Sequence, residues 1–378
     1  MNDFSEYEKI PQSFKSLNLD EKAFQELTKV KWVVTEKVHG ANFSFIYELD
    51  NDNNSDNNSN NNYKLFFAKR KEILSWNDDF FAFQLLVNQI EDKILNLFEA
   101  LNQEISNEIS KEYSNNTTIF VKKYIIFGEL FGGEYPHANI PKNIDLQAIQ
   151  TGVYYSNNIG FYAFDIAFET ENKEENKEEN NQPERIYLDY EKALNYFEKY
   201  DLLHAKPLFI GKLNECLAFN TRINSTIPAL LGLPLLENNL IEGVVVKPFH
   251  NPSTEIIKFR PIIKIKNKEF DEKIAFHQAK KWSYTPETTF LSKSVALSFL
   301  VDELCQYLNQ NRLNSVLSKI GKLDKTNILR MENIKTELLR DILVDFDEDT
   351  NNMFSELQPP QQQWLKDRLN AKINDFLS

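Results

Sequence analysis

The chain of 378 residues is longer than one compact core usually contains, and its 42% hydrophobic content is ample for burial. No apolar run approaches the roughly 20 residues needed to cross a bilayer, and the first residues are acidic where a signal or transit peptide would be apolar or basic. The two cysteines, Cys216 and Cys305, support neither a disulfide framework nor a zinc site. We therefore expect a soluble, cytoplasmic monomer with a large and a small domain and no membrane partner.

The net charge of -13 lowers the expectation of a nucleic-acid enzyme without excluding one, because a local basic patch makes phosphate contacts. Two low-complexity segments carry much of the negative charge, -3 in residues 50–62 and -5 in residues 169–184. Such tracts cannot bury enough apolar area to offset their ordering entropy. We expect disordered insertions at about 50–62 and 170–184, both between strands and both dispensable for chemistry.

The first part of the chain is predicted to be rich in strands. Residues 31–47 alternate apolar and polar side chains as a half-buried strand does, and residues 63–68 resume the pattern. Residues 79–113 have helical spacing. Aromatic and β-branched residues predict further strands at 119–130, 160–168, 186–188, 241–247 and 261–265. These elements indicate an α+β domain over residues 1–272.

The end of the chain is predicted to be helical. The helical spacing of i, i+3, i+4, i+7 and i+11 is met by Leu297, Leu300, Val301, Leu304 and Leu308. Further helical stretches follow to Ser378. Residues 273–289, which contain Pro286, form the predicted linker, so residues 290–378 form the predicted small domain.

The common phosphate-binding loops are missing, since neither GxxxxGK[ST] nor GxGxxG occurs. A different candidate for nucleotide chemistry is Lys37, which is predicted to lie at the end of a strand in the run EKVHGANF from Glu36 to Phe43. A lysine can act as a nucleophile if other cations keep its amine unprotonated. Taken alone, Lys37 could equally be a solvated lysine at a strand end.

Four further runs place charged residues within apolar strands: FGELFGG from Phe127, YAFDI from Tyr162, IEGVVVKP from Ile241 and IIKIKNK from Ile262. In the last run the two strand lysines are two residues apart and so project from one face. Paired lysines that face inward are costly unless an anion meets them. Each run alone could also be an edge position or a turn-side charge.

In order and spacing these runs resemble the nucleotidyltransferase motifs of the covalent ligase superfamily, and most closely the RNA ligase 2 family of phage RNA ligases and trypanosome RNA-editing ligases. EKVHGANF resembles the family's KxxG motif, AKR at residues 68–70 the next motif, and the other runs follow in order. NRLNSVLSKIG at residues 311–321 is similar to part of the family's C-terminal domain. The resemblance covers about residues 25–325. It implies an α+β nucleotidyltransferase (ATP-grasp-like ligase) domain of antiparallel sheets with helices, followed by a small all-helical domain that engages RNA.

The resemblance implies an ATP-dependent RNA ligase that joins 3′-OH and 5′-phosphate ends, at nicks in duplex RNA, through lysyl-AMP and RNA-adenylate intermediates. Lys37 would be the nucleophile, and the lysines of IIKIKNK would contact the α-phosphate and disfavour protonation of the attacking amine. The implied catalytic residues are Lys37, His39, Asn42, Lys264 and Lys266. The implied nucleotide-binding residues are Glu36, Val38, Arg70, Glu129, Phe164, Glu242, Lys247, Lys264 and Lys266.

Individual roles follow from the same resemblance. Glu129 would accept a hydrogen bond from a ribose hydroxyl, Arg70 would contact the ribose or the reacting phosphate, and Phe164 would stack on adenine. Lys247 would face the α-phosphate. Glu242 would hold the divalent ion, Mg²⁺ or Mn²⁺, because a hard cation prefers carboxylate and phosphate oxygens. The expected partner is RNA with a 3′-OH/5′-phosphate break.

Two alternatives stay open. A DNA ligase or an mRNA guanylyltransferase shares the lysyl-nucleotide core but continues into an OB-fold barrel, whereas this tail has helical spacing. A non-catalytic RNA-binding relative is disfavoured because the charged core residues are all retained. In the tail, Arg312, Lys319 and Lys322 are predicted to share a helix face that contacts the RNA backbone, with an ordinary solvated face as the alternative.

Overall fold

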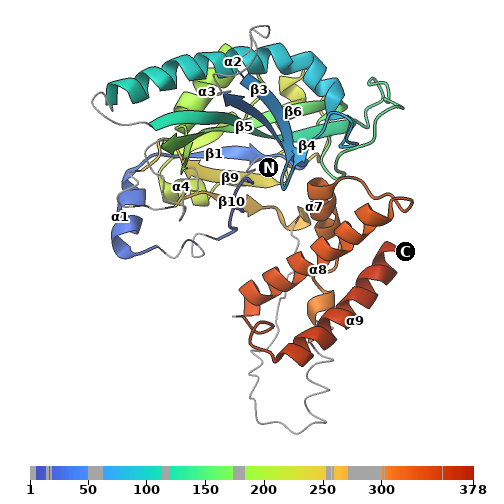
Figure 1. The fold of residues 1–378 in the computed structure, drawn as a ribbon. Coiled ribbons are helices and arrows are strands. Elements are labelled where there is room, and N and C mark those ends of the chain that lie inside the picture. The colour runs from blue at the N-terminus through green and yellow to red at the C-terminus, as the bar shows by residue number, and fades with distance from the viewer. Residues whose placement is uncertain are drawn as a thin grey trace, which may run out of the picture. The chain divides into compact units, whose positions relative to one another are not determined.

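The computed structural model describes residues 6–13, 17, 19–49, 63–112, 119–172, 184–252, 257, 259–270, 300–301, 303–350 and 352–378. The chain divides into two compact units, Met1–Asn267 and Lys268–Ser378, each described by itself (Figure 1). The predicted linker and most of both predicted insertions lie outside the described residues. The second insertion is shorter than predicted at its ends, because residues 170–172 and 184 belong to strands. The domain limits at 272 and 290 stay predictions.

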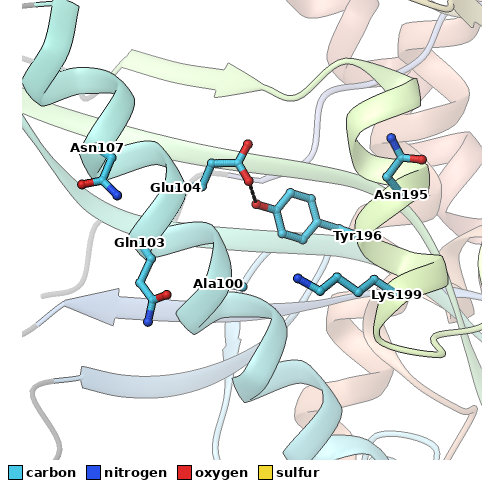
Figure 2. A pocket seen from close by; sticks show the side chains of 7 residues that line it. All are labelled: Ala100, Gln103, Glu104, Asn107, Asn195, Tyr196 and Lys199. Atoms are coloured by element: carbon cyan, nitrogen blue, oxygen red, sulfur yellow. Dashed lines mark hydrogen bonds between the residues drawn. The ribbon is translucent and has the colours of Figure 1, made fainter.

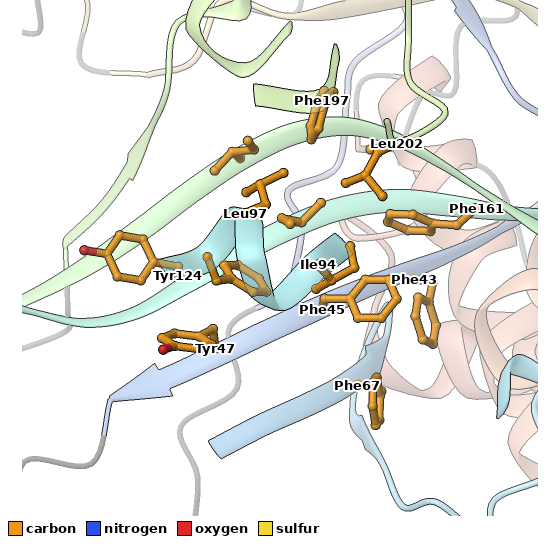
Figure 3. Packing of buried hydrophobic residues seen from close by; sticks show 14 of the residues in the cluster. Phe43, Phe45, Tyr47, Phe67, Ile94, Leu97, Tyr124, Phe161, Phe197 and Leu202 are labelled. Atoms are coloured by element: carbon orange, nitrogen blue, oxygen red, sulfur yellow. The ribbon is translucent and has the colours of Figure 1, made fainter. Parts of the chain in front are cut away.

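The first unit contains an antiparallel six-stranded sheet whose order is β4-β3-β2-β5-β6-β7. The strands are β2 (Ala41–Leu49), β3 (Tyr63–Lys69), β4 (Ile73–Leu74), β5 (Ile119–Glu134), β6 (Ser156–Asn172) and β7 (Glu184–Tyr187). Helices α2 (Phe83–Glu112) and α3 (Tyr190–Lys199) cover one face (Figure 1). Alternate β2 residues Phe43, Phe45 and Tyr47 point to that face and pack with Leu97 of α2 and Phe197 of α3 in one core (Figure 3).

A second antiparallel sheet has the order β10-β9-β1-β8. Its strands are β1 (Trp32–Lys37), β8 (Pro207–Gly211), β9 (Gly243–Pro248) and β10 (Ile263–Lys266). On one face Trp32, Val34 and Val244 pack against α1 (Glu21–Lys29) and α4 (Leu213–Leu217). Because side chains alternate along a strand, Thr35 and Lys37 occupy the opposite face. The α+β class of antiparallel sheets with helices is therefore confirmed.

The prediction of one strand over residues 31–47 is wrong. The strand is interrupted after Lys37, and its two halves join different sheets. Gly40 explains the break. A Cβ atom on Gly40 would lie 2.0 Å from the carbonyl oxygen of Leu130 and 2.8 Å from Cγ of Glu129. Only glycine allows the backbone to pass this close to β5. Lys37 therefore lies where the chain crosses between the two sheets.

The second unit is helical, as predicted. It contains η2 (Lys268–Phe270), α7 (Gln310–Ile320), α8 (Ile328–Thr350) and α9 (Pro359–Leu377). The three long helices enclose a separate core that includes Leu300 and Leu304, two residues of the predicted apolar face. Among the described residues of both units, no helix is long and apolar enough to span a membrane.

Candidate active site

Lys37 ends β1 at a point where three strands bring two lysines together. In the sheet register Lys37 lies opposite Gly243 of β9, and Gly243 lies opposite Lys266 of β10. Lys264, two residues earlier on β10, shares the face of Lys266. A Cβ atom on Gly243 would lie 2.1 Å from the carbonyl oxygen of Ile265, so a larger residue would push the strands apart. The side chains of Lys37, Lys264 and Lys266 are thus gathered on one face of the four-stranded sheet.

The carboxylate of Glu242 is the centre of this surface. Its Oε2 atom lies 2.7 Å from Nζ of Lys37 and 3.4 Å from Nδ1 of His39, and its Oε1 atom lies 3.1 Å from Nζ of Lys266. Burial raises the pKa of Glu242, but the Lys37 and Lys266 cations and the His39 hydrogen bond outweigh it and hold the pKa well below its usual range. Glu242 is therefore an anion at neutral pH, held by three basic side chains.

Glu129 adds a second carboxyl group to the same surface. It lies on β5 opposite Asn42 of β2, so both side chains share a face of the six-stranded sheet. Burial and the neighbouring Glu242 carboxylate raise the pKa of Glu129 to about 7, against the cations of Lys37, Arg70 and Lys266. Glu129 can therefore donate or accept a hydrogen bond near neutral pH. Glu129 and Glu242 thus share charge interactions with the other predicted site residues of this surface, which are Lys37, His39, Arg70 and Lys266.

The raised pKa of Glu129 predicts a pH-dependent stability. The folded state holds this proton more tightly than the unfolded chain, so the stabilisation is complete below about pH 4.5 and is lost as the pH rises through about 7. The amide side chain in Glu129→Gln is neutral at every pH, so the variant keeps this stabilisation. We expect the variant to gain up to about 3 kcal/mol in unfolding free energy over the wild type at pH 8, and little at pH 4.5.

Urea denaturation of the nucleotide-free proteins at several pH values measures this difference. Glu237→Gln, at an exposed position, is the matched control for loss of one carboxylate. A Glu129→Gln advantage that stays constant from pH 4.5 to 8 would contradict the prediction.

Glu36 takes the face opposite to Lys37 and is engaged by protein groups. Its buried carboxylate accepts hydrogen bonds from Oγ of Ser225 at 2.6 Å and from N and Oγ1 of Thr226 at 2.9 and 2.7 Å. Burial raises the pKa of Glu36, although these hydrogen bonds oppose the shift. Val38 is buried as well. The nucleotide contacts of Glu36 and Val38 stay predictions.

Lys247 lies in a different cluster from Glu242. Its Nζ atom donates to Oδ1 of Asp165 at 2.7 Å and to the carbonyl oxygen of Phe164 at 2.9 Å. Nη2 of Arg260 lies 2.5 Å from the same Asp165 oxygen. Although burial raises the pKa of Asp165, Arg260 and Lys247 lower it to about 2. In the structure the contacts of Lys247 are with a carboxylate and the Phe164 backbone, and its phosphate contact stays a prediction.

Neither Arg260 nor Tyr155 is among the site residues predicted from the sequence. Arg260 lies just before the IIKIKNK run, and its closeness in sequence to the two strand lysines is the only feature that could have indicated it. The Tyr155 hydroxyl accepts a hydrogen bond of 2.8 Å from the backbone N–H of His39, and no motif marks that tyrosine.

Within the described residues, no group of three or more His, Cys, Asp or Glu side chains is arranged to hold a metal ion. The two nearby carboxyl groups, Glu129 and Glu242, are nevertheless hard oxygen donors. Magnesium usually takes one or two protein carboxylates and completes its shell with water and substrate phosphates. The donor set therefore fits a metal ion that arrives with a nucleotide.

The predicted basic face of the second unit is wrong for two of its three residues. Arg312 is buried, and its Nη2 atom lies 2.9 Å from Oδ2 of Asp345. Lys319 pairs with Glu337 and Asp341, and its side chain is only 11% exposed. These partners recur every four residues along α8 and so form a carboxylate stripe: Glu337, Asp341 and Asp345. Arg312 and Lys319 thus join α7 to α8, while Lys322 is exposed.

A polar groove of 440 Å³ lies away from Lys37, between α2 and α3 (Figure 2). Its lining residues are Ala100, Gln103, Glu104, Asn107, Asn195, Tyr196 and Lys199. Glu104 accepts a hydrogen bond from Tyr196 and pairs with Lys192 at 2.8 Å. None of the predicted site residues lines this groove, so the charged surface around Glu242 is the stronger candidate for chemistry.

Comparisons with known proteins identify relatives of this chain. The family model described as RNA ligase matches residues 30–266, and the one described as T4 RNA ligase 2 C-terminal matches residues 291–375. The mitochondrial RNA-editing ligase 1 of Trypanosoma brucei brucei is 29% identical over 363 residues, with 85% of this chain and 70% of the relative covered. For mitochondrial RNA-editing ligase 2 of the same organism the values are 28% over 360 residues, 85% and 77%.

Among solved structures, a mutant Naegleria gruberi RNA ligase with AMP and Mn is 15% identical, with a TM-score of 0.37. The match covers 70% of this chain and 56% of that chain, so this chain spans little more than half of the solved protein.

Proposed function

The chain belongs to the RNA ligase family, and from this premise we propose that it is an ATP-dependent enzyme that joins a 3′-OH end to a 5′-phosphate end of RNA. The observation that carries the proposal is the Lys37 amine, held 2.7 Å from Glu242 with the Lys266 amine on the other oxygen of that carboxylate. A nucleophilic amine beside a second fixed cation suits attack on a phosphorus atom.

The reaction is proposed in three balanced steps. Nζ of Lys37 loses its proton and bonds to the α-phosphorus of ATP, and pyrophosphate leaves. An oxygen of the RNA 5′-phosphate then attacks the same phosphorus and displaces the Lys37 amine. Finally the RNA 3′-OH loses its proton and attacks the 5′-phosphate, and AMP leaves. Negative charge grows on phosphoryl oxygens in each step, so Lys264 and Lys266 are assigned to offset it.

Other residues are assigned to binding and orientation. Phe164 would stack on adenine, Glu129 and Arg70 would contact the ribose or phosphate, and His39 and Asn42 would act in the later steps. Glu242, a hard oxygen donor, would hold Mg²⁺ or Mn²⁺. When bound, such an ion polarises phosphoryl oxygens and neutralises their charge.

Nicks in duplex RNA are the proposed substrate, supported by the match of residues 291–375 to a T4 RNA ligase 2 C-terminal domain. A DNA ligase or guanylyltransferase is less well supported, because the described part of residues 268–378 forms helices rather than the strands of an OB-fold barrel. A monomeric state and a cytoplasmic location remain our proposals.

The decisive test is incubation of the full chain with α-labelled ATP and Mg²⁺, followed by denaturation. Label on the protein is expected, as is its transfer to nicked RNA and then sealing. Matched nicked DNA and single-stranded RNA are the controls for substrate class. A full-length protein that binds ATP yet never acquires label would favour the non-catalytic relative.

A further inference from the structure

An N-terminal segment runs between the two sheets of the first unit. We call residues 6–11 the N-terminal strap. Nη1 of Arg185, on β7, donates a hydrogen bond of 2.8 Å to the carbonyl oxygen of Glu6. The hydroxyl of Tyr187, also on β7, donates to the carboxylate of Glu8. The strap is thereby fixed to the edge strand of the six-stranded sheet.

The centre of the strap is Tyr7, which is only 6% exposed. Its hydroxyl donates to Oδ2 of Asp165 at 2.7 Å and accepts from Nη1 of Arg260 at 2.8 Å. Its ring meets the ring of Phe164 edge-on, with 5.2 Å between centroids. Tyr7 therefore contacts both Phe164, the proposed adenine platform, and the carboxylate that neutralises Lys247.

The other end of the strap reaches the four-stranded sheet. The carbonyl oxygen of Pro11 accepts a hydrogen bond of 2.9 Å from the backbone N–H of Lys264. Lys264 and Lys266 are the β10 lysines that we assign to the α-phosphate. The same six residues are thus bonded to the strand of the proposed adenine platform and to the strand of the proposed phosphate-binding lysines.

We propose that the N-terminal strap, through Tyr7, is a positioning element that holds the Phe164 segment and the β10 lysines at the separation a bound nucleotide requires. This inference rests on the proposed function. Tyr7 acts through Asp165 and Phe164 and touches no reacting atom itself. Hydrogen bonds in a chain from Arg260 through Tyr7 to the charged carboxylate of Asp165 strengthen one another, so loss of the Tyr7 hydroxyl weakens the whole chain.

The test is Tyr7→Phe, which removes one hydroxyl and keeps the ring on Phe164. We expect the KM for ATP in lysyl-AMP formation to rise about 10-fold while kcat changes less than about 3-fold, because a loosened platform weakens ground-state and transition-state binding alike. The matched control is Tyr124→Phe, which removes the hydroxyl of a buried tyrosine that bonds Asn102 of α2 and does not touch the strap. Its KM should stay at the wild-type value.

A purely structural role gives a different result. Both variants would then lose thermal stability and active fraction, which lowers the amplitude of adduct formation without changing KM. An unchanged KM in Tyr7→Phe, or an equal rise in Tyr124→Phe, overturns the positioning role. Should Tyr7→Phe fail to fold, Arg260→Lys interrupts the same chain and must raise the KM for the proposal to stand. Absence of adduct in the wild type would instead remove the proposed function.

Discussion

Lys37→Ala is expected to reduce covalent adenylylation on the order of 10⁴-fold or more, the scale on which loss of a nucleophile acts. The variant lacks the amine that would bond to the α-phosphorus, and the neighbouring Lys266 is already placed on Oε1 of Glu242. The fold should persist, because Glu242 keeps Lys266 and His39 as partners. Label from α-labelled ATP on denatured protein measures the effect.

Two further variants separate charge from nucleophilicity. Lys37→Arg keeps a cation beside Glu242 and should restore thermal stability, yet it should form no adduct because the guanidinium group stays protonated. Lys31→Ala removes an exposed lysine just before β1 and should adenylylate like the wild type. If Lys37→Ala acquires label at the wild-type rate, another residue is the nucleophile.

The sequence predicted local features of the site well. The KxxG run correctly placed Lys37 at a strand end, and the spacing of Lys264 and Lys266 correctly placed both on one strand. Such features depend on the alternation of side chains along a single strand, which the sequence states directly. The crossing at Gly40 was not predicted, because the close approach of Leu130 comes from a strand 90 residues away.

The contacts that the sequence did not predict join residues that are far apart in the chain. Tyr7 and Asp165 are 158 positions apart and Tyr7 and Arg260 are 253 apart, so no local pattern joins them. The same reason explains the error in the second unit. A helical projection places Lys319 on a polar face, but only packing reveals that α8 presents Glu337 and Asp341 to it. A charged face predicted from one helix is therefore weak evidence for RNA binding.

Removal of the helical unit is expected to separate the two halves of the reaction. The cut is placed at residue 273 so that Asn267 is kept, because its backbone N–H donates to the carbonyl oxygen of Glu242 at 2.8 Å and its side chain donates to Ile241. A chain of residues 1–273 keeps every proposed nucleotide-binding residue and the cores of both sheets. It should therefore form lysyl-AMP at a rate within about 3-fold of the full chain.

The same truncated chain should seal nicked duplex RNA at least about 100-fold more slowly, since a lost set of phosphate contacts costs orders of magnitude in affinity. A nick with a pre-adenylylated 5′ end measures this last step alone. Sealing by the full chain should fall steeply between low and physiological salt, whereas adduct formation should respond little. Because Arg312 and Lys319 are held by α8 carboxylates, we do not expect these two side chains to produce the salt response. Equal sealing by both chains across the titration would leave the second unit without a substrate-binding role.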